Sequence, residues 1–180
     1  MPDTFFITTP IYYVNDIPHI GHAYTSIAAD FIARFKRMSG VNTIFLTGTD
    51  EHGQKIQKAA EKKSINPIDL CNENSNKFRE LTQILNLSND DFIRTTEERH
   101  IEGAKSLWNK LYESGDIYLD KYKGWYSVND ETFYNEKDLI KQADGSFKTI
   151  TSGPVEWIEE ESYFFKLSNY SEKLLKLYDD

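Results

Sequence analysis

Ile7-Thr-Thr-Pro-Ile-Tyr-Tyr-Val-Asn-Asp-Ile-Pro-His-Ile-Gly-His22 runs a short strand-like segment into a turn that opens a helix. Residues 4–9 are rich in β-branched and aromatic side chains, which is typical of a buried strand. Apolar side chains then recur at helical spacing until Gly40 ends the series: Ala23, Ile27, Ala28, Phe31, Ile32, Phe35 and Met38. We therefore predict a strand over residues 4–9 and a helix that begins near Gly21.

The start of this helix has the chemistry of an anion site. Its first backbone N–H groups lack partners within the helix and the helix dipole is positive at this end, so a phosphate is well held there. Gly21 lets a phosphate approach the backbone, and His19 and His22, three positions apart, can both face it. Two alternatives are open. The histidines could simply cap the helix, or they could share a metal ion with the Asp-Glu-His tripeptide at 50–52.

A second apolar segment, residues 42–47, reads as another strand, and Gly48-Thr-Asp-Glu-His-Gly53 reads as the loop that follows it. Strand, helix and strand in this order predict a right-handed parallel unit, in which ligands bind beyond the carboxyl ends of the strands. The loop with the two histidines and the loop with Asp50 and His52 should therefore open on the same edge. Asp50 is the natural partner there for a substrate ammonium group.

Helices are expected at residues 54–63, 67–85 and 97–114. Pro67 suits a first helical position, and Thr95 with Glu98 matches a capping box for the last helix. Beyond Gly115 the pattern changes, because residues 117–128 and 155–167 read as strands and Asp144-Gly145 reads as a turn. We place a boundary here, with an α/β domain over 1–115 and a strand-rich module over 116–180.

The composition is that of a cytoplasmic globular protein. The 180 residues are 39% hydrophobic, with no apolar run of membrane length and no secretion signal. A single cysteine, Cys71, excludes an internal disulfide and a cysteine-rich zinc site, and we expect it to be buried. The net charge of −8 argues against a surface coated for nucleic acid, so the basic helical face within residues 55–63 is interpreted as solvated.

Three separated motifs resemble one protein family. Thr8-Thr-Pro-Ile-Tyr-Tyr-Val-Asn15, Pro18-His-Ile-Gly-His-Ala-Tyr-Thr25 and Leu46-Thr-Gly-Thr-Asp-Glu-His-Gly53 are similar to segments of the methionyl-tRNA synthetases, within class I of the aminoacyl-tRNA synthetases. The similarity continues through residues 91–100 and 160–165, so it covers essentially the whole chain. The resemblance implies an α/β fold in which 1–115 form the first half of a Rossmann-type catalytic domain and 116–180 begin its connective insertion.

The resemblance also implies a reaction and a site. Methionine and ATP, the latter with Mg²⁺, would form methionyl-adenylate, and the methionyl group would then pass to tRNA(Met). On this basis His19, Gly21 and His22 hold the ATP phosphates, and the two histidines are the catalytic residues. Methionine binds against four positions, the last of them the weakest candidate: Ile11, Tyr13, Asp50 and His52.

The insertion lacks the cysteine pairs that many methionyl enzymes carry. Ser127 and Asp130 stand at the C-x-x-C spacing instead, and neither is a good structural zinc ligand, so we expect no zinc and no other resident metal. Aromatic side chains are expected to stabilise the insertion in its place: Trp125, Tyr126, Phe133, Tyr134 and Trp157.

The Lys-Met-Ser-Lys-Ser loop of the family does not occur in this sequence. We therefore interpret the chain as an N-terminal fragment and expect it to be inactive by itself. Two alternatives stay open: a fragment that only binds a ligand or tRNA, and a smaller nucleotidyltransferase with the same H-x-G-H motif. The motif at residues 46–53 and the insertion after residue 115 argue against the second alternative.

Overall fold

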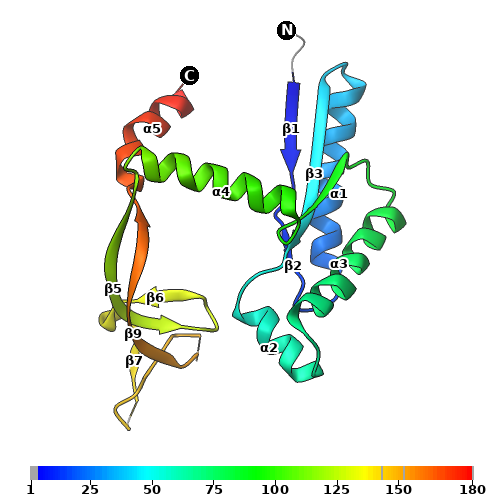
Figure 1. Cartoon of the computed structure of the whole chain (residues 1–180). Coiled ribbons are helices and arrows are strands. Elements are labelled where there is room, and N and C mark those ends of the chain that lie inside the picture. The colour runs from blue at the N-terminus through cyan, green and yellow to red at the C-terminus, as the bar shows by residue number, and fades with distance from the viewer. Residues whose placement is uncertain (1–3, 143, 152, 180) are drawn as a thin grey trace. The chain divides into compact units, whose positions relative to one another are not determined.

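The computed structural model describes residues 4–142, 144–151 and 153–179. The chain forms two compact units, Met1–Ala104 and Lys105–Asp180, which divide within the helix α4 (Glu98–Glu113) (Figure 1). Within the described ranges, no helix has both the length and the apolar character needed to cross a membrane. The assignment of 116–180 to a connective insertion stays a prediction.

A parallel sheet forms the centre of the first unit. Strand β3 (Asn42–Asp50) is paired on both sides: β1 (Thr4–Thr8) and β2 (Tyr12–Tyr13) pair along one side, and β4 (Asp91–Arg94) pairs along the other (Figure 1). Every one of these pairings is parallel, so the carboxyl ends of the strands lie at one edge. The predicted α/β fold with a parallel sheet is confirmed.

Three helices belong to this unit: α1 (Ile20–Met38), α2 (Gln54–Lys63) and α3 (Pro67–Ile84). Each lies within about two residues of its predicted range. Gly40, with a φ of 80°, follows the end of α1, and Pro67 occupies the first turn of α3 as expected. Cys71 is buried in α3, which confirms that prediction.

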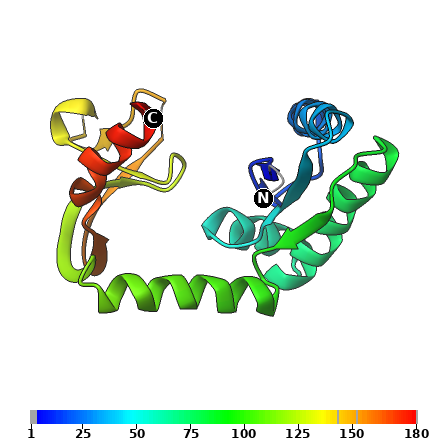
Figure 2. The same ribbon diagram turned by 90° about the horizontal axis from the view of Figure 1, so that it is seen from above.

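Helices α1 and α3 cover the same face of the sheet (Figure 2). Ala29 and Ala33 of α1 pack against Phe45, and Thr49 shares a hydrogen bond of 3.0 Å with Ser75 of α3. Residues 45 and 49 point to the same side of β3 because side chains alternate along a strand. On the opposite face the paired residues Phe6 and Ile44 are exposed.

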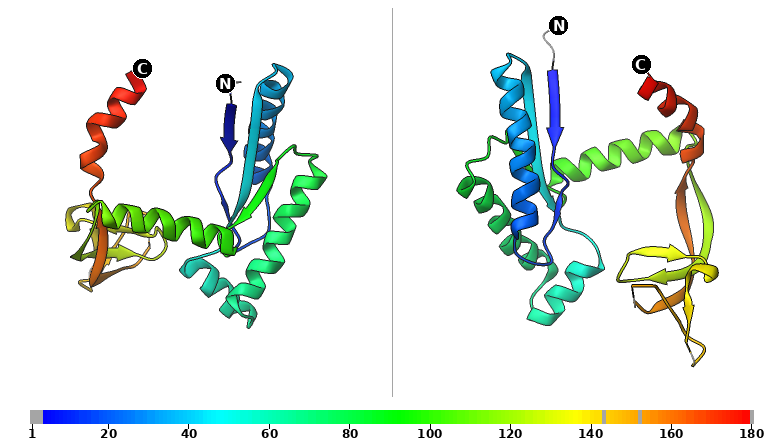
Figure 3. Two further views of the ribbon diagram at one scale, coloured as in Figure 1. Left: turned by 45° about the horizontal axis from the view of Figure 1, so that its top comes forward. Right: turned by 180° about the vertical axis from the view of Figure 1, so that it is seen from behind.

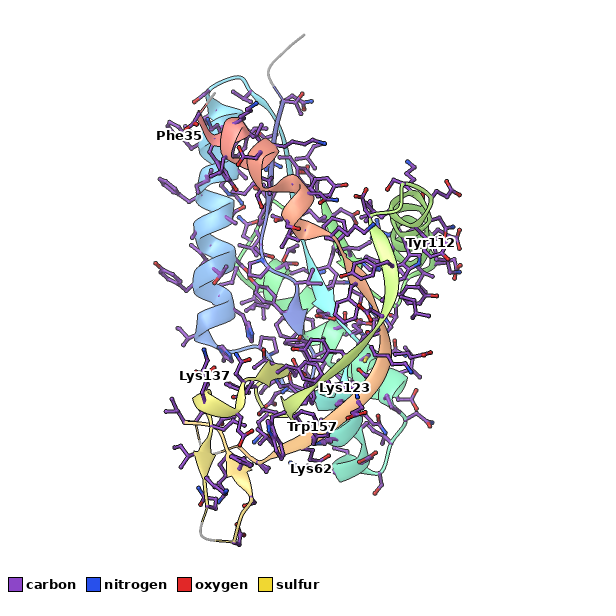
Figure 4. All side chains as sticks on the ribbon, turned by 90° about the vertical axis from the view of Figure 1, so that its left-hand side faces the viewer. Phe35, Lys62, Tyr112, Lys123, Lys137 and Trp157 are labelled. Atoms are coloured by element: carbon purple, nitrogen blue, oxygen red, sulfur yellow. The ribbon has the colours of Figure 1, made fainter. Side chains whose placement is uncertain are left out.

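The apolar series that predicted α1 is not the series that packs on the sheet. The helix turns its small residues Ala29 and Ala33 inward, which allows a close approach to the strands. Its larger apolar side chains are exposed along the outer side, including Phe35, labelled in Figure 4: Ile27, Phe31, Ile32, Phe35 and Met38. Periodicity located the helix correctly but does not say which of its sides meets the sheet.

Strand β3 is three residues longer than predicted. We expected a loop from Gly48, yet β3 continues to Asp50, and Gly48 pairs with Ile93 of β4. A Cβ atom at residue 48 would lie 2.0 Å from the Ile93 carbonyl oxygen and 2.6 Å from its side chain. Gly48 therefore allows β3 and β4 to pack closely, and it does not mark the start of a loop.

The capping box predicted for α4 is wrong. The helix begins at Glu98, and the hydroxyl of Thr95 instead accepts the backbone N–H of Glu51 at 2.9 Å. Strands β2 and β4 were also not predicted, because segments of two and four residues carry too little periodicity.

The second unit is built on two long antiparallel strands, β5 (Ile117–Ser127) and β9 (Val155–Phe165), which pair along their whole length (Figure 3). Both lie within two residues of their predicted ranges. The shorter elements are β6 (Thr132–Tyr134), η1 (Glu136–Asp138), β7 (Ile140–Lys141), β8 (Phe147–Lys148), η2 (Leu167–Tyr170) and α5 (Ser171–Asp179). Gly145 has a φ of 85° in the predicted turn between β7 and β8.

Aromatic rings fill much of this second unit. Trp125 lies edge-on to Trp157, with ring centroids 5.4 Å apart, and its ring also contacts Phe147 at 4.7 Å. Tyr126 and Phe133 face one another across β5 and β6 at 4.8 Å. Such pairs add about 0.5–1.5 kcal/mol each beyond their buried area.

Gly48→Ala should destabilise the first unit by about 1–3 kcal/mol, the usual cost of forcing extra volume into a packed interior. The measurement is the midpoint of urea unfolding. Gly103→Ala in α4 is the matched control, because a Cβ there meets nothing within 4 Å and should be neutral or slightly stabilising. Equal midpoints for Gly48→Ala and the unsubstituted chain would contradict this packing role.

Candidate active site

The two histidines cap α1 reciprocally. His19 is the N-cap residue, and its Nδ1 accepts the backbone N–H of Gly21 at 3.1 Å. Nδ1 of His22 in turn accepts the backbone N–H of His19, also at 3.1 Å. A neutral imidazole that accepts at Nδ1 carries its proton at Nε2. Each ring therefore keeps an Nε2–H that can donate to an anion, so the cap does not use the atom that an anion would need.

Close packing holds this pair in place. The rings of His19 and His22 stack with centroids 3.8 Å apart. A Cβ atom on Gly21 would lie 3.0 Å from the His19 ring, so glycine is the residue that fits beneath it. Tyr12 and Phe78 contact the His22 ring at 4.8 and 5.0 Å between centroids.

The surroundings of His22 favour its neutral form. Burial lowers the pKa of His22 below its usual value of 6.5, and the nearby His19 lowers this pKa further. A neutral ring keeps Nδ1 as the acceptor for the cap. An imidazolium has N–H groups at both positions and would lose that acceptor.

Residues that sequence reasoning did not assign to the site support it from below. Tyr12 is buried, and its hydroxyl shares a hydrogen bond of 2.9 Å with Ser26. The side-chain amide of Asn74, in α3, donates to the carbonyl of Val14 at 2.7 Å and so anchors the loop before α1. Asn74 and Phe78 lie more than 50 residues from the histidines in sequence, and no local pattern marks them.

One depression of about 440 Å³ collects several of the predicted residues. Ile11 and Tyr13, both partly exposed, line it together with His19 and His22. Asp50 is next to this group, because it pairs with Tyr13 in the parallel register of β2 and β3. The first-strand loop and the end of β3 thus meet at one edge of the sheet.

His52 lies apart from this depression. It lines a different cavity of about 560 Å³ beside α2, and its Nε2–H donates to the carbonyl of Thr95 at 3.3 Å. The hydrogen bond gives His52 a structural partner within the same unit.

We expected Glu51 to lie with Asp50 in the loop after residue 47, but Glu51 is not exposed there. Its side chain is fully buried, and Arg94 binds it through two nitrogens at 2.7 and 2.9 Å. Of the two adjacent carboxylates, Asp50 alone is left at the edge of the sheet for a cationic ligand.

A metal shared by His19 and His22 would need further ligands close by. No group of three or more His, Cys, Asp or Glu side chains that could hold a metal ion occurs among the residues that the structure describes. Burial raises the pKa of the Cys71 thiol to about 11, so this cysteine stays protonated and is a poor metal ligand. The metal-pair alternative for His19 and His22 therefore gains no support.

The Ser127 and Asp130 pair forms a hydrogen-bonded corner. The Ser127 hydroxyl donates to the Asp130 carboxylate at 2.8 Å and accepts the Asp130 backbone N–H at 3.2 Å. Tyr134 and Thr151 also donate to this carboxylate. These bonds hold the pKa of Asp130 below its usual value, so the carboxylate stays ionised and satisfied by hydroxyl groups.

The profile of one protein family, described as "tRNA synthetases class I (M)", matches residues 5–145. The chain belongs to this family of class I synthetases. It is 55% identical over 179 residues to the methionine–tRNA ligase of Rickettsia felis and 53% identical over 182 residues to that of Rhizobium meliloti. These alignments cover 99% and 100% of this chain, but only 34% and 35% of the relatives.

A solved structure agrees with these relatives. The chain is similar to Mycobacterium tuberculosis methionyl-tRNA synthetase in complex with methionyl-adenylate, with a TM-score of 0.88 and 48% identity. The match covers 98% of this chain and 35% of that one. The chain therefore spans about a third of the length of the proteins it matches.

We expect NMR titration to place the pKa of His22 below 6.5. Between the folded and unfolded pKa values the unfolded chain binds more protons, so the stabilisation from the neutral ring is complete above pH 6.5 and is lost as the pH falls below it. Phe78→Ala should raise the pKa of His22 by admitting water, whereas Phe31→Ala, on the exposed side of α1, should leave it unchanged. A His22 pKa at or above 6.5 would contradict this account.

Proposed function

We propose that the protein to which this chain belongs is a methionine–tRNA ligase. It forms methionyl-adenylate from methionine and ATP and transfers the methionyl group to tRNA(Met). The observation that carries the proposal is the reciprocal histidine cap, found in a chain 48% identical to a synthetase solved with methionyl-adenylate. The smaller nucleotidyltransferase reading is not favoured by any feature of the site.

Adenylate formation needs stabilised negative charge more than it needs a protein nucleophile. The methionine carboxylate attacks the α-phosphorus of ATP, a new carboxylate–phosphate bond forms, and pyrophosphate leaves. The Nε2–H groups of His19 and His22 and the N-terminal N–H groups of α1 donate to the phosphoryl oxygens, on which the charge develops. The stacked, capped rings are already in position, so little reorganisation is needed.

Magnesium would arrive on the ATP phosphates. The donors at the start of α1 are imidazole and backbone N–H groups, whereas Mg²⁺ prefers oxygen ligands. The described residues at this point do not offer a magnesium site of their own, and the role of the chain is to bind the phosphates directly.

Methionine is expected to bind beside the phosphates. Asp50 accepts the α-ammonium group, and Ile11 and Tyr13 provide an apolar wall for the thioether side chain. His52 is the weaker candidate, because its Nε2–H already donates to Thr95. The remainder of the pocket and the lysine-rich loop of the family would come from parts of the protein outside these 180 residues.

His22→Ala in the full-length enzyme should lower the rate of methionine-dependent ATP–pyrophosphate exchange by about 10²–10³-fold, because one preorganised donor is lost. Met38→Ala, at the far, exposed end of α1, should leave the rate unchanged. An unchanged rate for His22→Ala would refute the assignment of phosphate binding to this residue.

Asp50→Asn should raise the KM for methionine while the KM for ATP stays nearly constant, because the substitution removes the charge partner of one ligand only. The same exchange reaction, with one substrate varied at a time, gives both constants. If both values rose by the same factor, Asp50 would have a structural role.

A further inference from the structure

Two segments that lie far apart in the sequence meet at the buried carboxylate of Glu51. Glu51 follows β3, and Arg94 and Thr96 lie at and just beyond the end of β4. Arg94 donates to both carboxylate oxygens, Thr96 donates to Oε2, and Thr49 donates to Oε1 at 2.8 Å. The side chain of Glu51 is 0% exposed and that of Arg94 is 19% exposed.

The pair is ionised despite its burial. Burial by itself would raise the pKa of Glu51, but the hydrogen bonds from Arg94, Thr96 and Thr49 and the charge of Arg94 outweigh it and hold the pKa below its usual value. The same contact raises the pKa of Arg94. Glu51 is therefore a neutralised anion, and it adds little negative charge where ATP phosphates would approach.

Backbone groups around the ion pair are hydrogen-bonded as well. The N–H of Glu51 donates to the Thr95 hydroxyl at 2.9 Å, and the N–H of Thr95 donates to the carbonyl of Thr49 at 3.3 Å. His52 donates from its ring to the carbonyl of Thr95. Residues 49, 51 and 52 are thus each bonded to Thr95, and Asp50 lies between them.

Helix α3 completes the attachment. Arg94 donates a further hydrogen bond to the side-chain oxygen of Asn72 at 2.7 Å, and Thr49 shares one with Ser75. The ends of β3 and β4 and one side of α3 are therefore joined at a single ion pair. Arg99 also binds both carboxylate oxygens of Asp91, but the side chains of Arg99, Asp91 and Glu97 are 30–50% exposed, so these pairs are far better hydrated than that of Glu51.

We propose that Glu51 and Arg94 are positioning residues for the methionine side of the site. They fix the backbone of Asp50 beside Tyr13, and of the two adjacent carboxylates they leave Asp50 to meet the substrate ammonium group. This inference rests on the proposed function. It assigns a role to residues 94–96, which touch neither the histidine cap nor the depression beside it.

Arg94→Lys tests the inference in the full-length enzyme, because lysine keeps the charge but cannot bind both carboxylate oxygens in a planar fork. We expect the KM for methionine to rise about tenfold or more, because the Asp50 carboxylate would shift by up to about 1 Å. The KM for ATP should change less than about twofold. Arg99→Lys is the matched control and should alter neither constant.

Thr96→Val provides a milder second variant, since it removes one hydrogen bond to Glu51 and keeps the ion pair. It should fold normally and raise the KM for methionine by a smaller factor, again with little change for ATP. If Arg94→Lys does not fold, Thr96→Val decides the question. A methionine KM equal to that of the unsubstituted enzyme in either folded variant, or equal increases for both substrates, would overturn the inference.

The outcome separates the two proposals. If the unsubstituted full-length enzyme shows no methionine-dependent exchange, the proposed function is wrong. If exchange is present and Arg94→Lys behaves like Arg99→Lys, only the positioning role is wrong.

Discussion

The parallel pairing of β3 on both of its sides is the constraint on which the rest of the site depends. It places the ends of β2, β3 and β4 at one edge, so Tyr13 and the segment around Arg94 lie on either side of the end of β3 although they are far apart in sequence. Gly48 makes this possible, because any side chain there would collide with Ile93. Strand pairing thereby decides where the chemistry can occur.

The histidine pair and the Glu51–Arg94 ion pair give this edge two different electrostatic environments. Histidine rings at the start of α1 use one nitrogen for the backbone and keep the other for a ligand, and the packing of Tyr12 and Phe78 favours the neutral ring that this division needs. At the end of β3, Arg94 neutralises Glu51 and leaves Asp50 available. A phosphate and an ammonium group could therefore be bound close together, with little repulsion between the phosphate and the protein.

Sequence patterns predicted the parts of this arrangement that depend on local signals. Helix α2, the start of α3 and the strands β5 and β9 follow from turn residues and periodicity, and the two histidines follow from the H-x-G-H turn. The errors concern long-range contacts. The sequence pattern places Gly48 in a loop, but a glycine is needed there because the backbone of β3 passes so close to Ile93. The pattern makes Thr95 a helix cap, but its hydroxyl instead accepts a hydrogen bond from Glu51, 44 residues away. The burial of Glu51 likewise depends on Arg94, 43 residues away, so the residues next to Glu51 in the sequence do not predict it.

A crystal structure of the full-length protein with a non-hydrolysable methionyl-adenylate analogue would test the central claim most directly. We expect the Nε2 atoms of His19 and His22 within about 3 Å of phosphate oxygens, and the Asp50 carboxylate at a similar distance from the methionine ammonium group. The depression lined by Ile11 and Tyr13 should hold part of the ligand. An analogue bound elsewhere, or one whose ammonium group is held by residues other than Asp50, would contradict the account.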